Sequence, residues 1–135
     1  MSAALELDEL PELVFASGLP GFRHVHRFAL VRADGEGPFG ILRALDEPEV
    51  QFVVVPPMLF FSEYEPEIDD TDAEALGLTD ADGALLLVVV TVAEDITRST
   101  ANLLGPIVIN PETRQGAQVI LSGTEHKTQT PLLPV

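Results

Sequence analysis

Short apolar segments alternate with polar turns along most of the 135-residue chain. The apolar segments are rich in Val, Ile, Leu and Phe, and Gly, Pro, Asp or Asn residues stand between them. Both features are typical of β-strands that end at tight turns. We therefore expect strands at residues 12–16, 26–32, 39–45, 50–55, 84–92 and 117–121.

One stretch, residues 100–111, is apolar almost throughout but contains Gly105-Pro106 at its centre. Proline cannot donate a hydrogen bond to a strand ladder, and glycine weakens a strand interior. The stretch therefore predicts two short buried strands joined by a bend. Asn102 and Asn110 stand near its ends, and we expect their side chains to bind backbone groups at the bend and at the strand end.

Helical signals are confined to one place in the chain. Thr71 and Glu74 have the spacing of a capping box, and Gly77 fits the residue that follows a helix end. We expect one short helix near residues 72–76. Short strands with almost no helix predict an all-β fold, either an antiparallel barrel-like domain or a sandwich.

The length fits a single domain with a real core. We expect a partly ordered N-terminal segment at residues 1–11, one β domain at residues 12–122 and a polar C-terminal tail at residues 123–135. The chain has no cysteine, and its N-terminus lacks the basic and apolar regions of a signal peptide. No apolar run reaches the ~18 residues of a membrane span. These features predict a cytoplasmic protein.

The net charge of −15 is unevenly distributed. Between Ala44 and Thr97 the chain carries fourteen Asp or Glu residues and no Lys or Arg. Such a field speeds encounter with a basic partner and disfavours nucleic-acid binding through a basic face. A plain solvated surface that serves solubility is the alternative interpretation.

The sequence signals for a catalytic site or a metal site are weak. His24 and His26, at a spacing of two, would share one strand face and could hold a metal, but paired surface histidines are seldom metal ligands. Residues 70–74 resemble the start of a calcium loop, yet Ala75 and Ala81 stand where that loop needs Gly and Glu. There is no nucleophile-elbow motif and no phosphate-binding glycine loop. We therefore expect no catalytic residue, no cofactor and no metal.

Four segments, in this order, resemble the flagellar assembly factor FliW family. They are residues 15–22 (FASGLPGF), 52–65 (FVVVPPMLFFSEYE), 90–92 (VTV) and 100–110 (TANLLGPIVIN). The last is the most specific, because the family's pattern there is close to T-x-N-L-x-A-P-I-V-I-N. Three positions depart from the family: Gly105 replaces a usual Ala, Pro56 a usual Asn, and Arg23 a usual acid. Gly105 and Pro106, with Asn102 and Asn110, form the structural signature.

The resemblance implies a non-enzymatic, barrel-like protein without a cofactor. Proteins of this family bind the RNA-binding carbon storage regulator CsrA and relieve its repression of flagellin translation. They also bind flagellin, so that flagellin synthesis is coupled to flagellar assembly. We expect no direct contact with nucleic acid or membrane, and a monomer when free.

Aromatic residues beside carboxylates indicate where partners bind, since such groups often dominate interfaces. The predicted partner-binding residues are Phe60, Phe61, Glu63, Tyr64, Glu65 and Glu67. The alternative is that both phenylalanines are core and only Glu63, Tyr64 and Glu65 are exposed. A competing function is a carbohydrate-binding or hydrolytic β domain that uses Tyr64 and paired carboxylates. Its mark is an aromatic cleft with two carboxylates about 5–10 Å apart.

Overall fold

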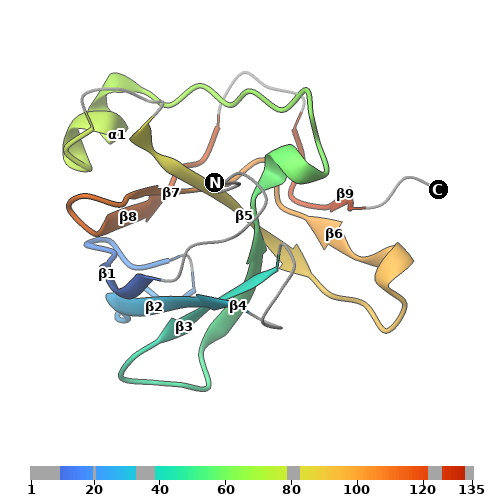
Figure 1. The fold of residues 1–135 in the computed structure, drawn as a ribbon, viewed down its shortest axis with the longest axis horizontal. Helices are drawn as coiled ribbons and strands as arrows, with labels where there is room; N and C mark the ends of the chain where they lie inside the picture. The colour runs from blue at the N-terminus through green and yellow to red at the C-terminus, as the bar shows by residue number, and fades with distance from the viewer. Residues whose placement is uncertain (1–9, 20, 33–38, 79–82, 122–125, 133–135) are drawn as a thin grey trace, which may run out of the picture.

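The computed structural model describes residues 10–19, 21–32, 39–78, 83–121 and 126–132. Strands account for most of the regular structure (Figure 1). The strands are β1 (Leu10–Val14), β2 (Arg27–Arg32), β3 (Gly40–Ala44), β4 (Gln51–Val55), β5 (Leu85–Thr91), β6 (Thr100–Ala101), β7 (Ile107–Asn110), β8 (Gln115–Gln118) and β9 (Thr130–Pro131). The helix α1 spans Asp70–Ala75, and short 3-10 turns span Pro57–Leu59 and Ile96–Arg98.

The sheet closes into a barrel. Its strand order is β4-β3-β2-β1-β8-β7-β5-β6-β9, and an additional pairing joins β4 to β5. Seven strands therefore form a closed ring, while β6 and β9 extend beside β5. Pairings are antiparallel except between β1 and β8, where Val14 pairs with Gln115 in parallel. The expectation of a barrel-like all-β domain is confirmed.

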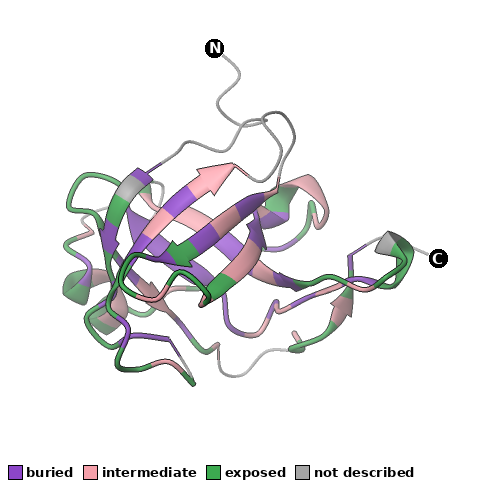
Figure 2. Cartoon of the chain, turned by 90° about the horizontal axis from the view of Figure 1, so that it is seen from below, coloured by how far each residue is buried: buried purple, intermediate pink, exposed green. Residues whose placement is uncertain are grey.

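Apolar side chains from alternate strand positions fill the barrel. Phe28 and Leu30 on β2 are fully buried, as their shared face predicts. They face Ala44 and Leu42 in the register of β3. The Phe15 ring meets Phe28 edge-on, with 5.3 Å between centroids. The buried bands on the strands in Figure 2 show this core from below.

Strand β8 begins two residues before the predicted strand at residues 117–121, and Gly116 explains the shift. A Cβ atom on Gly116 would lie 2.7 Å from the Phe15 ring. Glycine is therefore needed for the strand to pass over this ring, and the expected strand at residues 117–121 leaves it out.

The apolar stretch at residues 100–111 lies along one edge of β5. Strand β6 pairs with Val90 and Thr91, and β7 pairs with residues 85–87 of the same strand. Between β6 and β7 the chain leaves the ladder. The expectation of two short strands joined by a bend at Gly105-Pro106 is confirmed.

The helix begins differently from the prediction. Its N-cap residue is Asp69, and no cap side chain forms a hydrogen bond, so the capping box of Thr71 and Glu74 is wrong. Thr71 already lies inside the helix. The helix end is as expected: Gly77 has φ of +71° and its N–H donates to Glu74 O at 3.0 Å. This geometry suits glycine at the residue after a helix.

The two ends of the chain also differ from expectation. Strand β1 starts at Leu10, within the segment expected to be only partly ordered. Strand β9 lies within residues 123–135, which polar composition assigned to a tail, and it pairs with β6. Leu132 is 1% exposed, and its N–H donates to Ser99 O at 2.9 Å. Leu132 therefore anchors a segment that composition alone assigned to a tail. Residues 33–38, between the expected strands at 26–32 and 39–45, lie outside the described residues, as do residues 79–82 before β5.

Candidate functional site

The segment that follows β4 is a compact turn rather than a strand. Pro56 and Pro57 end the strand, and Pro57–Leu59 form a 3-10 turn. The N–H groups of Phe60 and Phe61 both donate to Pro57 O, at 3.0 and 2.7 Å. The N–H of Tyr64 donates to Phe61 O at 3.0 Å, which continues the turn. Successive side chains of residues 60–63 therefore do not point to opposite faces, as they would in a strand.

Both phenylalanines of this turn are half-buried. They pack against a cluster on the outer side of β5 that includes Val88, Val90 and Leu103. The Phe60 ring lies 6.0 Å from the Phe39 ring, centroid to centroid. Each phenylalanine keeps part of its surface in solvent, so neither is a fully buried core residue.

Tyr64 lies inside the molecule. It is 3% exposed, and its hydroxyl donates to Leu103 O at 2.6 Å. The His126 ring meets it edge-on, with 4.7 Å between centroids. Burial raises the pKa of the Tyr64 hydroxyl from 10.0 to about 12. The expected exposure of Tyr64 is wrong, because the turn directs its ring toward the bend after β6.

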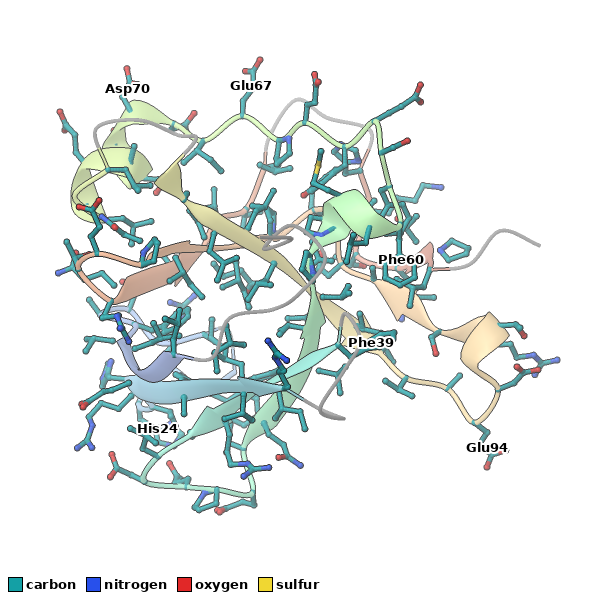
Figure 3. The ribbon with its side chains drawn as sticks, viewed as in Figure 1. His24, Phe39, Phe60, Glu67, Asp70 and Glu94 are labelled. Atoms are coloured by element: carbon teal, nitrogen blue, oxygen red, sulfur yellow. The ribbon has the colours of Figure 1, made fainter. Side chains whose placement is uncertain are left out.

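A row of exposed carboxylates leads from the turn to the helix. We name it the acidic ridge, and it consists of Glu63, Glu65, Glu67, Asp69 and Asp70. From Tyr64 to Asp69 the burial alternates, with the acids outward and Pro66 and Ile68 partly covered. Figure 3 shows Glu67 and Asp70 pointing away from the barrel. The ion pairs seen among the described residues use other carboxylates, those of Glu12, Asp46 and Glu47.

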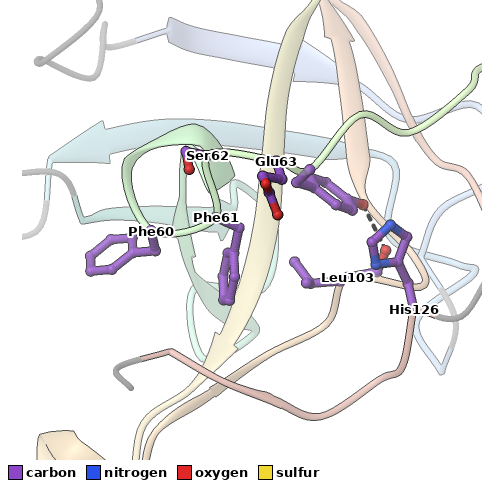
Figure 4. Close-up of a pocket in the computed structure, with 7 residues that line it drawn as sticks. Phe60, Phe61, Ser62, Glu63, Leu103 and His126 are labelled. Carbon is purple, nitrogen blue, oxygen red and sulfur yellow. Dashed lines mark hydrogen bonds between the residues drawn. The ribbon is translucent and has the colours of Figure 1, made fainter. Parts of the chain in front are cut away.

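A pocket of about 480 Å³ opens where the acidic ridge begins. Its lining comes from three parts of the chain that are far apart in sequence (Figure 4). The lining residues are Phe60, Phe61, Ser62, Glu63, Tyr64, Leu103 and His126. Tyr64 and Leu103 are buried and form its floor, whereas Ser62 and Glu63 are exposed at its rim. Sequence reasoning did not select Ser62, Leu103 or His126, and His126 stands in a polar segment without a local signal.

The bend after β6 is held by amide side chains. Asn102 Oδ1 accepts a hydrogen bond from the Gly105 N–H at 2.9 Å. Gln118 Nε2 donates to Gly105 O, also at 2.9 Å. A Cβ atom on Gly105 would lie 2.8 Å from Gln118 Nε2, so the side chain of an alanine there would require Gln118 to move. Pro106 follows, and its carbonyl accepts from the Val119 N–H at 2.9 Å.

The second asparagine ties the end of β7 to the helix. Asn110 is 5% exposed, and its Nδ2 donates to Leu76 O at 2.8 Å. Its Oδ1 accepts from the Glu112 N–H at 3.0 Å. The expectation that the two asparagines bind backbone groups at the bend and the strand end is confirmed.

The two histidines considered as metal ligands each contact another protein group instead. His24 Nε2 lies 3.0 Å from Glu47 Oε2, and His26 Nδ1 lies 3.0 Å from Phe15 O. Among the described residues no group of three potential ligands is close enough to hold a metal ion. Within the same part of the chain, no helix has the length and apolar character needed to cross a membrane.

The arrangement expected of a carbohydrate-cleaving site is not formed by the described residues. Among the described residues, Glu63 is the one carboxylate that lines the pocket. Tyr64 cannot stack on a sugar because its ring is covered. Glu94, which is adjacent to Asp95 in the chain, belongs to another pair of carboxylates. It lies at the tip of the connection between β5 and β6, away from Phe60 (Figure 3).

Comparisons with known proteins agree with one another. The family model described as FliW protein matches residues 1–132. The flagellar assembly factor FliW of Anoxybacillus flavithermus is 42% identical over 130 residues, which cover 96% of this chain and 89% of that protein. A protein of the same name from a Geobacillus species is 40% identical, with 96% and 90% covered. A crystal structure of the flagellar assembly factor FliW matches with a TM-score of 0.88 and 38% identity, over 97% of this chain and 92% of that one.

Proposed function

The chain belongs to the FliW family of flagellar assembly factors, and from this premise we propose that it is a non-enzymatic, cytoplasmic binding protein. Its partners are an RNA-binding translational repressor of the CsrA type and flagellin. Binding of the repressor relieves repression of flagellin translation, and binding of flagellin competes with it. The likeness of the chain to the FliW family supports the proposal of both partners. In the absence of a partner, the proposed state of the protein is a monomer.

We place the partner surface on the acidic ridge together with Phe60 and Phe61. The observation that carries this placement is that two half-buried aromatic rings line the same pocket as Glu63, the first carboxylate of the exposed acidic ridge. Partly covered aromatic side chains provide interface anchors, and the carboxylates attract a basic partner. An RNA-binding repressor carries the basic surface that such a ridge attracts.

Charge reversal tests this placement. The variant combines Glu63→Lys, Glu65→Lys and Glu67→Lys, and its affinity for purified CsrA and flagellin from the same organism is measured by calorimetry at several salt concentrations. We expect affinity for CsrA to fall by about tenfold or more, with a flatter salt dependence, because attractive charges become repulsive. Size-exclusion chromatography of the wild-type mixtures checks that each complex forms.

A matched control makes the same change in net charge elsewhere. It combines Glu49→Lys, Glu94→Lys and Glu112→Lys, all at exposed positions outside the acidic ridge. If the control weakens binding as much as the ridge variant, only the overall field matters and the placement is wrong. Unchanged affinity in the ridge variant would also show that the placement is wrong.

A further inference from the structure

We propose that the pocket accepts one aliphatic side chain, from Leu, Ile or Met, as an anchor. A linear segment of the CsrA-type repressor carries this anchor, with Lys or Arg on one side of it. This inference rests on the proposed function and adds the mode of recognition to it. The acidic ridge then binds the basic residues, and the pocket binds the apolar one.

The chemistry of the pocket favours an apolar occupant. Its floor is formed by Leu103 and by the Tyr64 ring, whose hydroxyl proton is already donated to Leu103 O. Phe60 and Phe61 add half-buried rings to the lining. A volume of about 480 Å³ holds a side chain together with part of the backbone that carries it.

The pocket is also held in shape before any partner arrives. Tyr64 OH binds Leu103 O at 2.6 Å, and the Leu103 N–H donates to Lys127 O at 3.0 Å. These bonds tie the turn after β4, the bend after β6 and the C-terminal segment to one another. Strand β9 then fixes the C-terminal segment to β6. A site formed in advance loses less conformational entropy on binding.

Charge gives the occupant its direction. The rim carries Glu63, and Glu65 and Glu67 continue the acidic ridge away from it. On the other wall His126 is followed by the exposed Lys127. A segment with basic residues on the ridge side of its anchor matches this asymmetry, whereas the reverse order meets Lys127.

Tyr64 supplies a reporter inside the pocket, because the chain has one tyrosine and no tryptophan. The probe is a blocked nine-residue peptide of Gly and Ser with one Leu and three Lys on one side of it, prepared in both orders. Two control peptides replace the Leu by Ser or the three Lys by Glu. We expect a saturable change of Tyr64 fluorescence with one order of the probe, and binding at least about tenfold weaker for each control peptide.

A variant that fills the pocket gives the second readout. Ser62→Phe adds a ring at the rim without removing a floor residue, and Ser17→Phe is the matched control at another exposed turn position. Circular dichroism checks that both variants fold. We expect Ser62→Phe to lose at least about tenfold in affinity for the probe and for CsrA, and Ser17→Phe to behave like the wild type.

The outcomes separate this inference from the proposed function. If CsrA binds the wild type and Ser62→Phe equally, and the probe leaves Tyr64 fluorescence unchanged up to about 5 mM, the pocket proposal is overturned while the proposed function stands. If the probe binds saturably but neither CsrA nor flagellin does, the pocket is supported and the proposed function fails. Equal binding of the Glu-containing control peptide contradicts the basic part of the occupant.

Discussion

The barrel interior and the flank beside the pocket are stabilised in different ways. We call the flank the set formed by the turn at residues 57–64, the bend at residues 102–106 and the C-terminal residues 126–132. Inside the barrel, Phe28, Leu30 and Leu42 pack against other apolar side chains and are fully buried. On the flank, Tyr64 and Asn102 bind backbone groups directly.

This difference follows from where the backbone hydrogen bonds are made. Strand ladders satisfy the N–H and C=O groups of the barrel, so its side chains need only be apolar and fit together. Apart from β9, the flank lies outside the strand ladder, and its buried backbone groups need partners from side chains or from other loops. An irregular backbone held in this way can form a pocket, which a regular ladder filled by side chains does not.

The largest effect is expected inside the barrel. Phe28→Ala removes a fully buried ring that contacts Phe15, and it should lower the free energy of unfolding by about 3–5 kcal/mol. Urea unfolding measures this loss. Met58→Ala, on a side chain that is 56% exposed, is the control and should change stability by less than about 0.5 kcal/mol. Similar losses for both variants would contradict a core centred on Phe28.

A smaller effect is expected on the flank. Tyr64→Phe leaves Leu103 O without its 2.6 Å hydrogen bond in a buried place, and it should cost about 1–3 kcal/mol in unfolding experiments. Thr113→Val removes two longer hydrogen bonds of an exposed side chain, one donated to Leu76 O at 3.4 Å and one accepted from the Gln115 N–H at 3.4 Å. This control should cost less than about 0.5 kcal/mol. If Tyr64→Phe is as mild as Thr113→Val, the hydroxyl does not hold the flank.

The last effect appears only in alkali. The pKa of Tyr64 is raised to about 12 in the folded protein, so folding favours the neutral phenol. Its contribution to stability is complete below the unfolded pKa near 10 and is lost as pH rises toward 12. Tyrosinate absorbance follows this single group directly. A midpoint near 10 in the folded protein, equal to that in urea, would mean that the ring is not buried.

The sequence pattern predicts the barrel well because a ladder has a local signature. Alternating burial places Phe28 and Leu30 in the core, and Gly105-Pro106 marks the interruption between β6 and β7. The roles of Asn102 and Asn110 follow from the same interruption, since a broken ladder needs side-chain partners. Each of these inferences depends on residues close together in the chain.

The flank is less predictable because its contacts join distant residues. Tyr64 and Leu103 are 39 positions apart, and no local pattern links them or places His126 beside them. The capping-box spacing of Thr71 and Glu74 matches a motif, yet the helix begins at Asp70. Pro56-Pro57 did carry a usable signal. Two prolines end a strand, so the side chains that follow them need not alternate between two faces.

In the proposed binding mode, partners contact the flank and the acidic ridge and not the barrel wall. Backbone amide NMR of the ¹⁵N-labelled protein, titrated with unlabelled CsrA, tests it most directly. We expect the largest shift changes at residues 58–67, 103–104 and 126–127, with small changes in β2 and β3. Large changes confined to β2 and β3, with the flank and the ridge unmoved, would contradict it.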